Sequence, residues 1–170
     1  MKQRMNYIKL GIILTITIIL TLSFSNLYRN YERNKISEGF ISKYVSVVKY
    51  NELASILTEM NSDTLLYISY VNDKDVYNLE KKIRKVLKNN ELEDNFFFVD
   101  ATNYINDSKI VTNLTSTLNI ASNESVVLPA IVYFKNNIPM DYIDSKADLI
   151  NTTDLELLLE KYELEIDKND

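Results

Sequence analysis

The side chains that can do chemistry in this sequence are carboxylates, lysines and tyrosines, because none of its 170 residues is cysteine, histidine or tryptophan. Without a thiol there is no disulfide, no thiolate nucleophile and no redox centre. Without histidine a Ser-His-Asp triad cannot be built, and a Cys/His metal site is excluded as well. General acid–base chemistry therefore falls to carboxylates, Lys or Tyr. Two of the carboxylates, Asp73 and Asp75, are separated by a single residue at the expected start of a helix.

Asp73 and Asp75 have three interpretations. An Asp-x-Asp pair can open a calcium loop, but that loop needs Gly at its sixth and Glu at its twelfth position, where this chain has Asn78 and Arg84. As an acid–base pair they would make a carboxylate-dependent enzyme, an alternative that lacks a second polar cluster. Carboxylates in the first turn of a helix more simply cap it and interact with its dipole. Capping is favoured, and we expect no metal and no cofactor.

Charge is distributed unevenly along the chain. Residues 1–35 hold six basic side chains and one acidic one, a net charge of +5, whereas the remaining 135 residues hold 13 basic and 23 acidic ones, a net charge of −10. Affinity for nucleic acid comes mainly from Lys and Arg that neutralise phosphates. An acidic body of this kind therefore excludes nucleic acid as the expected partner.

The basic segment 1–9 is followed by an apolar run that predicts a transmembrane anchor over residues 10–28. Its nineteen residues are close to the ~20 that cross a ~30 Å hydrocarbon core. The alternative is a cleaved signal peptide, with Ser23-Phe24-Ser25 as its cleavage site and a secreted product. Both interpretations place the acidic body outside the cytoplasm, as the C-terminal domain of a single-pass membrane protein or as a secreted one.

Residues 29–43 are expected to form a membrane-proximal linker or a continuation of the helix, and residues 165–170 a tail. Between them, over 44–164, strand and helix patterns alternate. Strands are expected over 44–50, 64–71, 95–102, 126–134 and 139–143, and helices over 51–60, 76–87, 108–118 and from 153 onward. This alternation predicts an α/β fold, with a mixed central sheet between two helical layers in a three-layer α/β/α sandwich.

Local signals add detail to these elements. Asn51 is available as an N-cap, and Thr153–Glu156 has the pattern of a capping box. Asn136 and Asn137 supply left-handed residues for a hairpin. Along 76–87, apolar residues recur at helical spacing, and Glu80 is assigned with its charged neighbours to the opposite, solvent-facing side.

The element order resembles the thioredoxin fold, with matches at Tyr67–Tyr70, Asn95–Asp100 and Leu128–Phe134. It is especially similar to the membrane-anchored thioredoxin-like proteins of low-GC Gram-positive bacteria, a group that includes bacteriocin-transport accessory proteins. The resemblance covers residues 44–164. It implies a cis-proline at position 129 and a Cys-x-x-Cys motif at 73–76, where neither end is cysteine. Because thiol–disulfide exchange needs a thiolate, an oxidoreductase of the usual kind is excluded.

In this architecture the loop after the second strand faces the loop before the fourth. The resemblance thus implies a binding site formed by Tyr70, Asn72, Asp73, Asp75, Val127, Leu128 and Pro129. A cis-proline leaves the backbone of Leu128 available to an extended peptide, although Pro129 has an alternative role in turning the chain into its strand. The resulting hypothesis is a membrane-anchored, redox-inactive, non-enzymatic binding or accessory module with a protein or peptide partner, in an export or envelope assembly.

Overall fold

The computed structural model describes residues 2–60, 62–121 and 123–164. The expected tail at 165–170 lies outside the described residues. The chain divides into two compact units, residues 1–35 and residues 36–170. The helices are α1 (Lys2–Ser37), α2 (Leu53–Glu59), α3 (Lys74–Asn89), α4 (Ile110–Thr117) and α5 (Thr152–Lys161), with short 3-10 turns η1 (Ile41–Lys43), η2 (Tyr50–Glu52) and η3 (Glu93–Asn95).

Helix α1 runs without interruption through the apolar segment 10–28 and continues to Ser37, so the first part of the expected linker is a continuation of the helix. It is long and apolar enough to cross a membrane, a property that it shares with signal sequences. The hydroxyls of Thr15, Thr17 and Thr21 donate to backbone carbonyls four residues earlier, at 2.8–2.9 Å. These bonds satisfy the polar groups within the helix itself, as an apolar surrounding requires.

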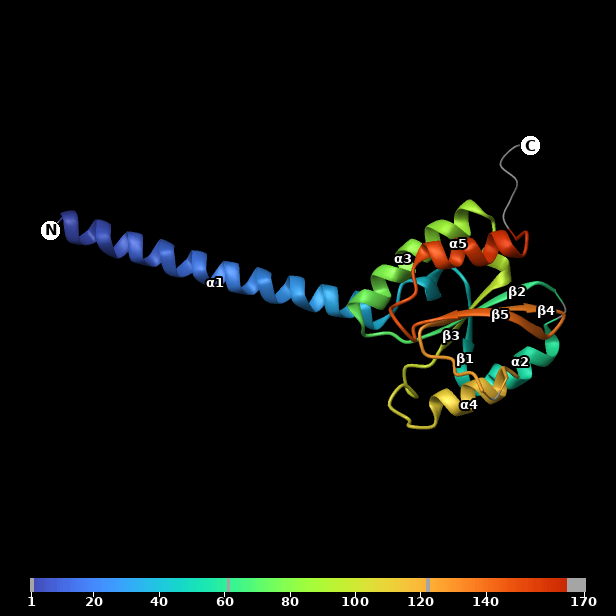
Figure 1. Ribbon diagram of the computed structural model, residues 1–170. Helices are drawn as coiled ribbons and strands as arrows, with labels where there is room; N and C mark the ends of the chain where they lie inside the picture. The colour runs from blue at the N-terminus through green and yellow to red at the C-terminus, as the bar shows by residue number, and fades with distance from the viewer. Residues whose placement is uncertain (1, 61, 122, 165–170) are drawn as a thin grey trace. The chain divides into compact units, whose positions relative to one another are not determined.

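The second unit is built on one five-stranded mixed sheet, as expected (Figure 1). Its strands are β1 (Ser46–Lys49), β2 (Thr64–Ser69), β3 (Phe96–Asp100), β4 (Ala130–Lys135) and β5 (Ile138–Asp144), in the spatial order β1-β3-β2-β4-β5. The first three strands are parallel, and β4 is antiparallel to both β2 and β5. All six residues of the central strand β2 are buried. The β4–β5 hairpin turns at Asn136 and Asn137, whose φ angles of 50° and 65° confirm the expected left-handed pair.

Helices cover both faces of the sheet, which confirms the predicted three-layer α/β/α sandwich (Figure 1). On one face, α3 and α5 pack on side chains such as Tyr67 and Phe98. On the other face, α2 and α4 pack on side chains such as Leu66 and Val132. Successive residues of a strand point to opposite faces, so the apolar run along β2 contributes side chains to the hydrophobic cores on both faces of the sheet.

Two helix starts differ from the sequence expectation. Asn51 is not an N-cap, because it lies in the 3-10 turn η2 and α2 begins only at Leu53. The capping box of α5 is formed by Asn151 and Asp154, two residues before the expected Thr153–Glu156 box. Asparagine is at least as good an N-cap as threonine, and its side chain here accepts two backbone N–H bonds, so the earlier start prevails.

The packing of α3 on the sheet generates a stability prediction. Ile83 is fully buried between α3 and the sheet, so Ile83→Ala should lower the free energy of unfolding by about 2–5 kcal/mol. Leu157→Ala is the matched control, because Leu157 on α5 is 58% exposed and its loss should cost within about 0.5 kcal/mol. Urea unfolding followed by circular dichroism measures both, and equal effects would contradict this assignment of the core.

Candidate functional site

The loop after β2 is held by hydrogen bonds from two other parts of the chain. The backbone N–H of Val71 donates to Oγ1 of Thr102 at 2.9 Å, and Thr102 is itself fixed by the Asp100 carboxylate. Asn72 has a φ of 68°, and its N–H donates to the carbonyl of Ile36 at 3.2 Å. Asparagine tolerates this left-handed backbone well. The loop therefore has a fixed backbone path into α3.

Asp73 caps α3 and Asp75 does not. One carboxylate oxygen of Asp73 accepts the N–H groups of Asp75 and Val76, at 2.8 and 2.9 Å. Asp75 lies exposed in the first turn, where a negative charge interacts favourably with the helix dipole. The capping expectation is thus confirmed for Asp73, whereas Asp75 contributes through its charge.

The loop before β4 contains the cis peptide bond Leu128–Pro129, which confirms what the resemblance implies. The backbone of Val127 is paired on both sides: its N–H donates to Oδ2 of Asp144 at 3.0 Å, and its carbonyl accepts from the N–H of Ser145 at 3.2 Å. The hydroxyl of Ser145 also donates to the carbonyl of Pro129 at 2.8 Å. Within the described part of the chain, the backbone of Leu128 makes no such bond.

Two of the predicted residues lie at the same end of the sheet. The last paired residues of β2 and β4 are Ile68 and Ala130, so Tyr70 and Leu128 each lie two residues beyond the same pair. Both side chains are half-buried, whereas Asn72 is exposed. Burial, with a smaller contribution from the charge of Asp73, raises the pKa of Tyr70, so its hydroxyl stays protonated at neutral pH. We call Tyr70 and Leu128 the Tyr70–Leu128 surface.

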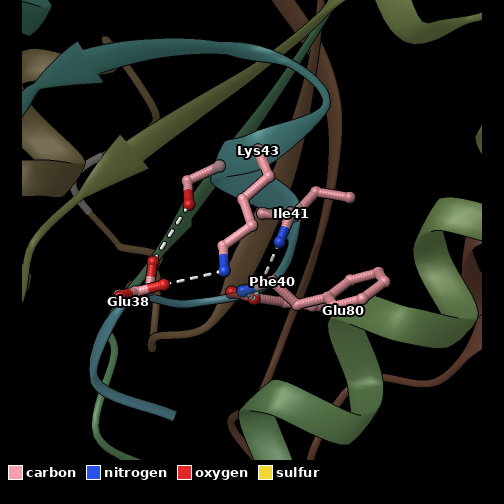
Figure 2. A network of polar contacts seen from close by, with 6 residues as sticks. Glu38, Phe40, Ile41, Lys43 and Glu80 are labelled. Atoms are coloured by element: carbon pink, nitrogen blue, oxygen red, sulfur yellow. Dashed lines mark hydrogen bonds and ion pairs between the residues drawn. The ribbon is translucent and has the colours of Figure 1, made fainter. Parts of the chain in front are cut away.

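Glu80 is a polar residue that the sequence assignment placed wrongly. It was expected on the solvent face of α3, yet it is 1% exposed. Its Oε2 accepts the backbone N–H groups of Phe40 at 2.6 Å and Ile41 at 3.1 Å (Figure 2). Its spacing was a usable signal, because position 80 lies four residues after Val76 and three before Ile83 and so shares their apolar face.

Other concave regions lie apart from these loops. A cavity of about 570 Å³ lies between β5 and α5, and Asp141, Asp144, Asp148 and Asp154 contribute to its lining. Asp141 is paired there with Lys161 at 2.5 Å. Across residues 2–60, 62–121 and 123–164, no three acidic side chains gather in a way that would hold a metal ion. No cofactor chemistry can be derived from this arrangement.

Solved structures similar to this chain include thioredoxins. They include oxidised thioredoxin from Plasmodium falciparum, at 19% identity and a TM-score of 0.47, with 69% of this chain and 97% of that chain covered. Thioredoxin f2 from Chlamydomonas reinhardtii is 12% identical, with a TM-score of 0.49 and coverage of 71% and 97%. No protein-family profile and no curated protein matches the chain. The likenesses concern the fold alone.

The capping geometry at Asp73 predicts a difference between two substitutions. Asp73→Ala should lower the free energy of unfolding by about 1 kcal/mol, because two N–H groups of α3 lose their acceptor. Asp73→Asn should be nearly neutral, since asparagine caps equally well. Chemical unfolding at neutral pH compares the two variants. If Asp73→Asn is as destabilising as Asp73→Ala, the charge and not the cap is what matters at this position.

Proposed function

We propose that this protein is a redox-inactive, thioredoxin-like binding or accessory module, anchored in a membrane by α1 with its domain on the extracytoplasmic side. The observation that carries the proposal is the helix start at 73–76. There the resemblance expects two cysteines, and this chain has a capping aspartate and Val76. A thioredoxin-like fold without cysteine is compatible with binding and not with thiol–disulfide exchange.

The loops support binding to an extended segment. The unpaired backbone of Leu128 offers main-chain hydrogen bonds to an added strand-like peptide, while Tyr70 and Leu128 offer apolar contact. The neighbouring loop backbone is held by Thr102, Ile36 and Ser145, so little ordering would be needed on binding. The expected partner is a protein or peptide of an export or envelope assembly.

A carboxylate-dependent enzyme receives no comparable support. The oxygen of Asp73 that faces α3 already accepts two backbone N–H groups. Asp75 is exposed to solvent, so it lacks the burial that tunes a catalytic carboxylate. We therefore assign Asp73 and Asp75 to stabilising the start of α3.

Membrane anchoring by α1 predicts the cellular fraction that contains the protein. The full chain should stay in the membrane pellet after alkaline and high-salt washing, because an apolar span is not released when surface charge is screened. Protease added to intact cells should remove the domain while a fragment with α1 remains. Recovery from the medium with an N-terminus at Asn26 would show instead that the segment is a cleaved signal peptide.

The binding role predicts the effect of changing the Tyr70–Leu128 surface. Tyr70→Ala combined with Leu128→Asp should abolish capture of a partner from membrane extracts, because the double variant loses both apolar contacts. Leu157→Asp is the control, since it places the same charge on an exposed residue of α5. As Tyr70 and Leu128 are half-buried, melting curves must show that the double variant is folded at the assay temperature. Undiminished capture by a folded double variant would exclude this surface as the interface.

A further inference from the structure

Three buried side-chain oxygens of the domain make no hydrogen bond of ordinary geometry among the described residues. They are Oε1 of Glu80, the hydroxyl of Tyr67 and the hydroxyl of Ser69. Glu80 is 1% exposed, and Tyr67 and Ser69 are both 0% exposed. Buried polar groups are rarely left unpaired, because each one costs free energy without a partner. Three such atoms in one region therefore need an explanation.

These three atoms belong to elements that pack against one another. Tyr67 and Ser69 are two residues apart on β2, so they point to the same face of the sheet, the face that α3 covers. Glu80 lies on the buried side of α3; burial and the negative charge of Glu80 raise the pKa of Tyr67, and the neighbouring Ser69 hydroxyl lowers it in part. One carboxyl group and two hydroxyls are thus buried on the side of the sheet that α3 covers.

The other oxygen of Glu80 ties down the segment before β1. Oε2 accepts from the N–H groups of Phe40 and Ile41, which begin the 3-10 turn η1 (Figure 2). Gly39 makes this approach possible: its φ is +69°, and a Cβ there would come within 3.0 Å of Val71 Cγ1. Like an N-cap side chain, Glu80 accepts backbone N–H groups at the start of a helical turn, but it does so from 39–40 residues away in the sequence.

The charged groups around Glu80 do not supply a counter-ion. On α3, Arg84 is paired with Glu93 and stacked on the Tyr44 ring. On the segment before β1, Lys43 is paired with Glu38 at 2.8 Å. From β3, the Asp100 carboxylate adds negative charge. The salt bridges of the described residues include none to Glu80.

We propose that Glu80, together with Tyr67 and Ser69, forms a buried proton-binding site that controls how firmly the segment 38–43 is held on α3. A proton from solvent binds Oε1, the carboxylate becomes a neutral carboxylic acid, and the new O–H donates to the oxygen of Ser69 or Tyr67. Oε2 keeps its two backbone N–H bonds. In the proton-bound state both oxygens of Glu80 make hydrogen bonds. In the proton-free state Oε1 carries buried negative charge without a hydrogen-bond donor.

The direction of the pH effect follows from the environment. Burial raises the pKa of Glu80 above its ordinary 4.5, the bonds from Phe40 and Ile41 lower it in part, and Asp100 raises it further. A group whose pKa is raised in the folded state binds protons more strongly there than in the unfolded chain. The contribution of Glu80 to the free energy of unfolding is therefore complete below pH 4.5 and is lost as the pH rises through the raised pKa of Glu80. The segment 38–43 should be held tightly in acid and more loosely in base.

Two measurements on the full chain in detergent micelles test this site. Carbon-13 NMR of the Glu80 carboxyl should give a titration midpoint above 4.5. Hydrogen exchange at the Phe40 and Ile41 amides, corrected for the intrinsic pH dependence of exchange, should show protection that decreases as the pH rises through that midpoint. Glu80→Gln imitates the neutral acid, because its amide has one acceptor oxygen and an NH2 donor group and does not titrate, so its protection at these amides should be independent of pH over the same range.

Glu156→Gln is the matched control, because Glu156 is exposed on α5 and should leave the wild-type pH dependence unchanged. A Glu80 midpoint at or below 4.5 would overturn the proposal, and this measurement needs no variant to fold. Equal pH dependence of amide protection in the wild type and in Glu80→Gln would overturn it as well. The inference does not depend on the binding role, because neither readout involves a partner.

Discussion

The complete burial of the central strand β2 is the constraint on which the rest of the domain depends. A strand that is covered on both faces and paired along both edges requires a helical layer on each side of the sheet, and it leaves its own polar side chains without access to water. Tyr67 and Ser69 must therefore find partners inside the domain, where Glu80 on α3 is a further buried polar residue. Beyond Ser69 the chain turns through Asn72 in a left-handed conformation, without a glycine.

The start of α3 keeps a defined shape where thiol chemistry would require cysteine. A helix N-terminus needs acceptors for its first N–H groups, and Asp73 supplies one that also suits the helix dipole. Long-range bonds from Thr102 and Ile36 fix the preceding loop, and Ser145 fixes the loop before β4. The result is a pair of loops held by hydrogen bonds, in which the backbone of Leu128 makes no hydrogen bond within the described part of the chain, and the sequence supplies no cysteine to exchange disulfides. This combination supports a binding role.

Periodicity predicted the order of the elements and the layers, because alternating strands and amphipathic helices are determined by local patterns. Capping was less predictable: Asp73 was identified correctly, whereas the start of α5 was displaced because Asn151 provides a competing cap. Glu80 was assigned to the solvent-facing side of the helix because of its charge, although its spacing from Val76 and Ile83 placed it on the buried face. The bonds that fix the loops, such as Asn72 to Ile36, join residues far apart in sequence and had no local signal.

The proposed binding role requires that the backbone and side chain of Leu128 contact a partner. Site-specific photocrosslinking in the native membrane tests this most directly, with a photoreactive amino acid in place of Leu128 and, as reference, in place of exposed Leu157. We expect one discrete cross-linked product from position 128 that is absent from position 157. A product from position 157 with none from position 128 would contradict the proposed binding role.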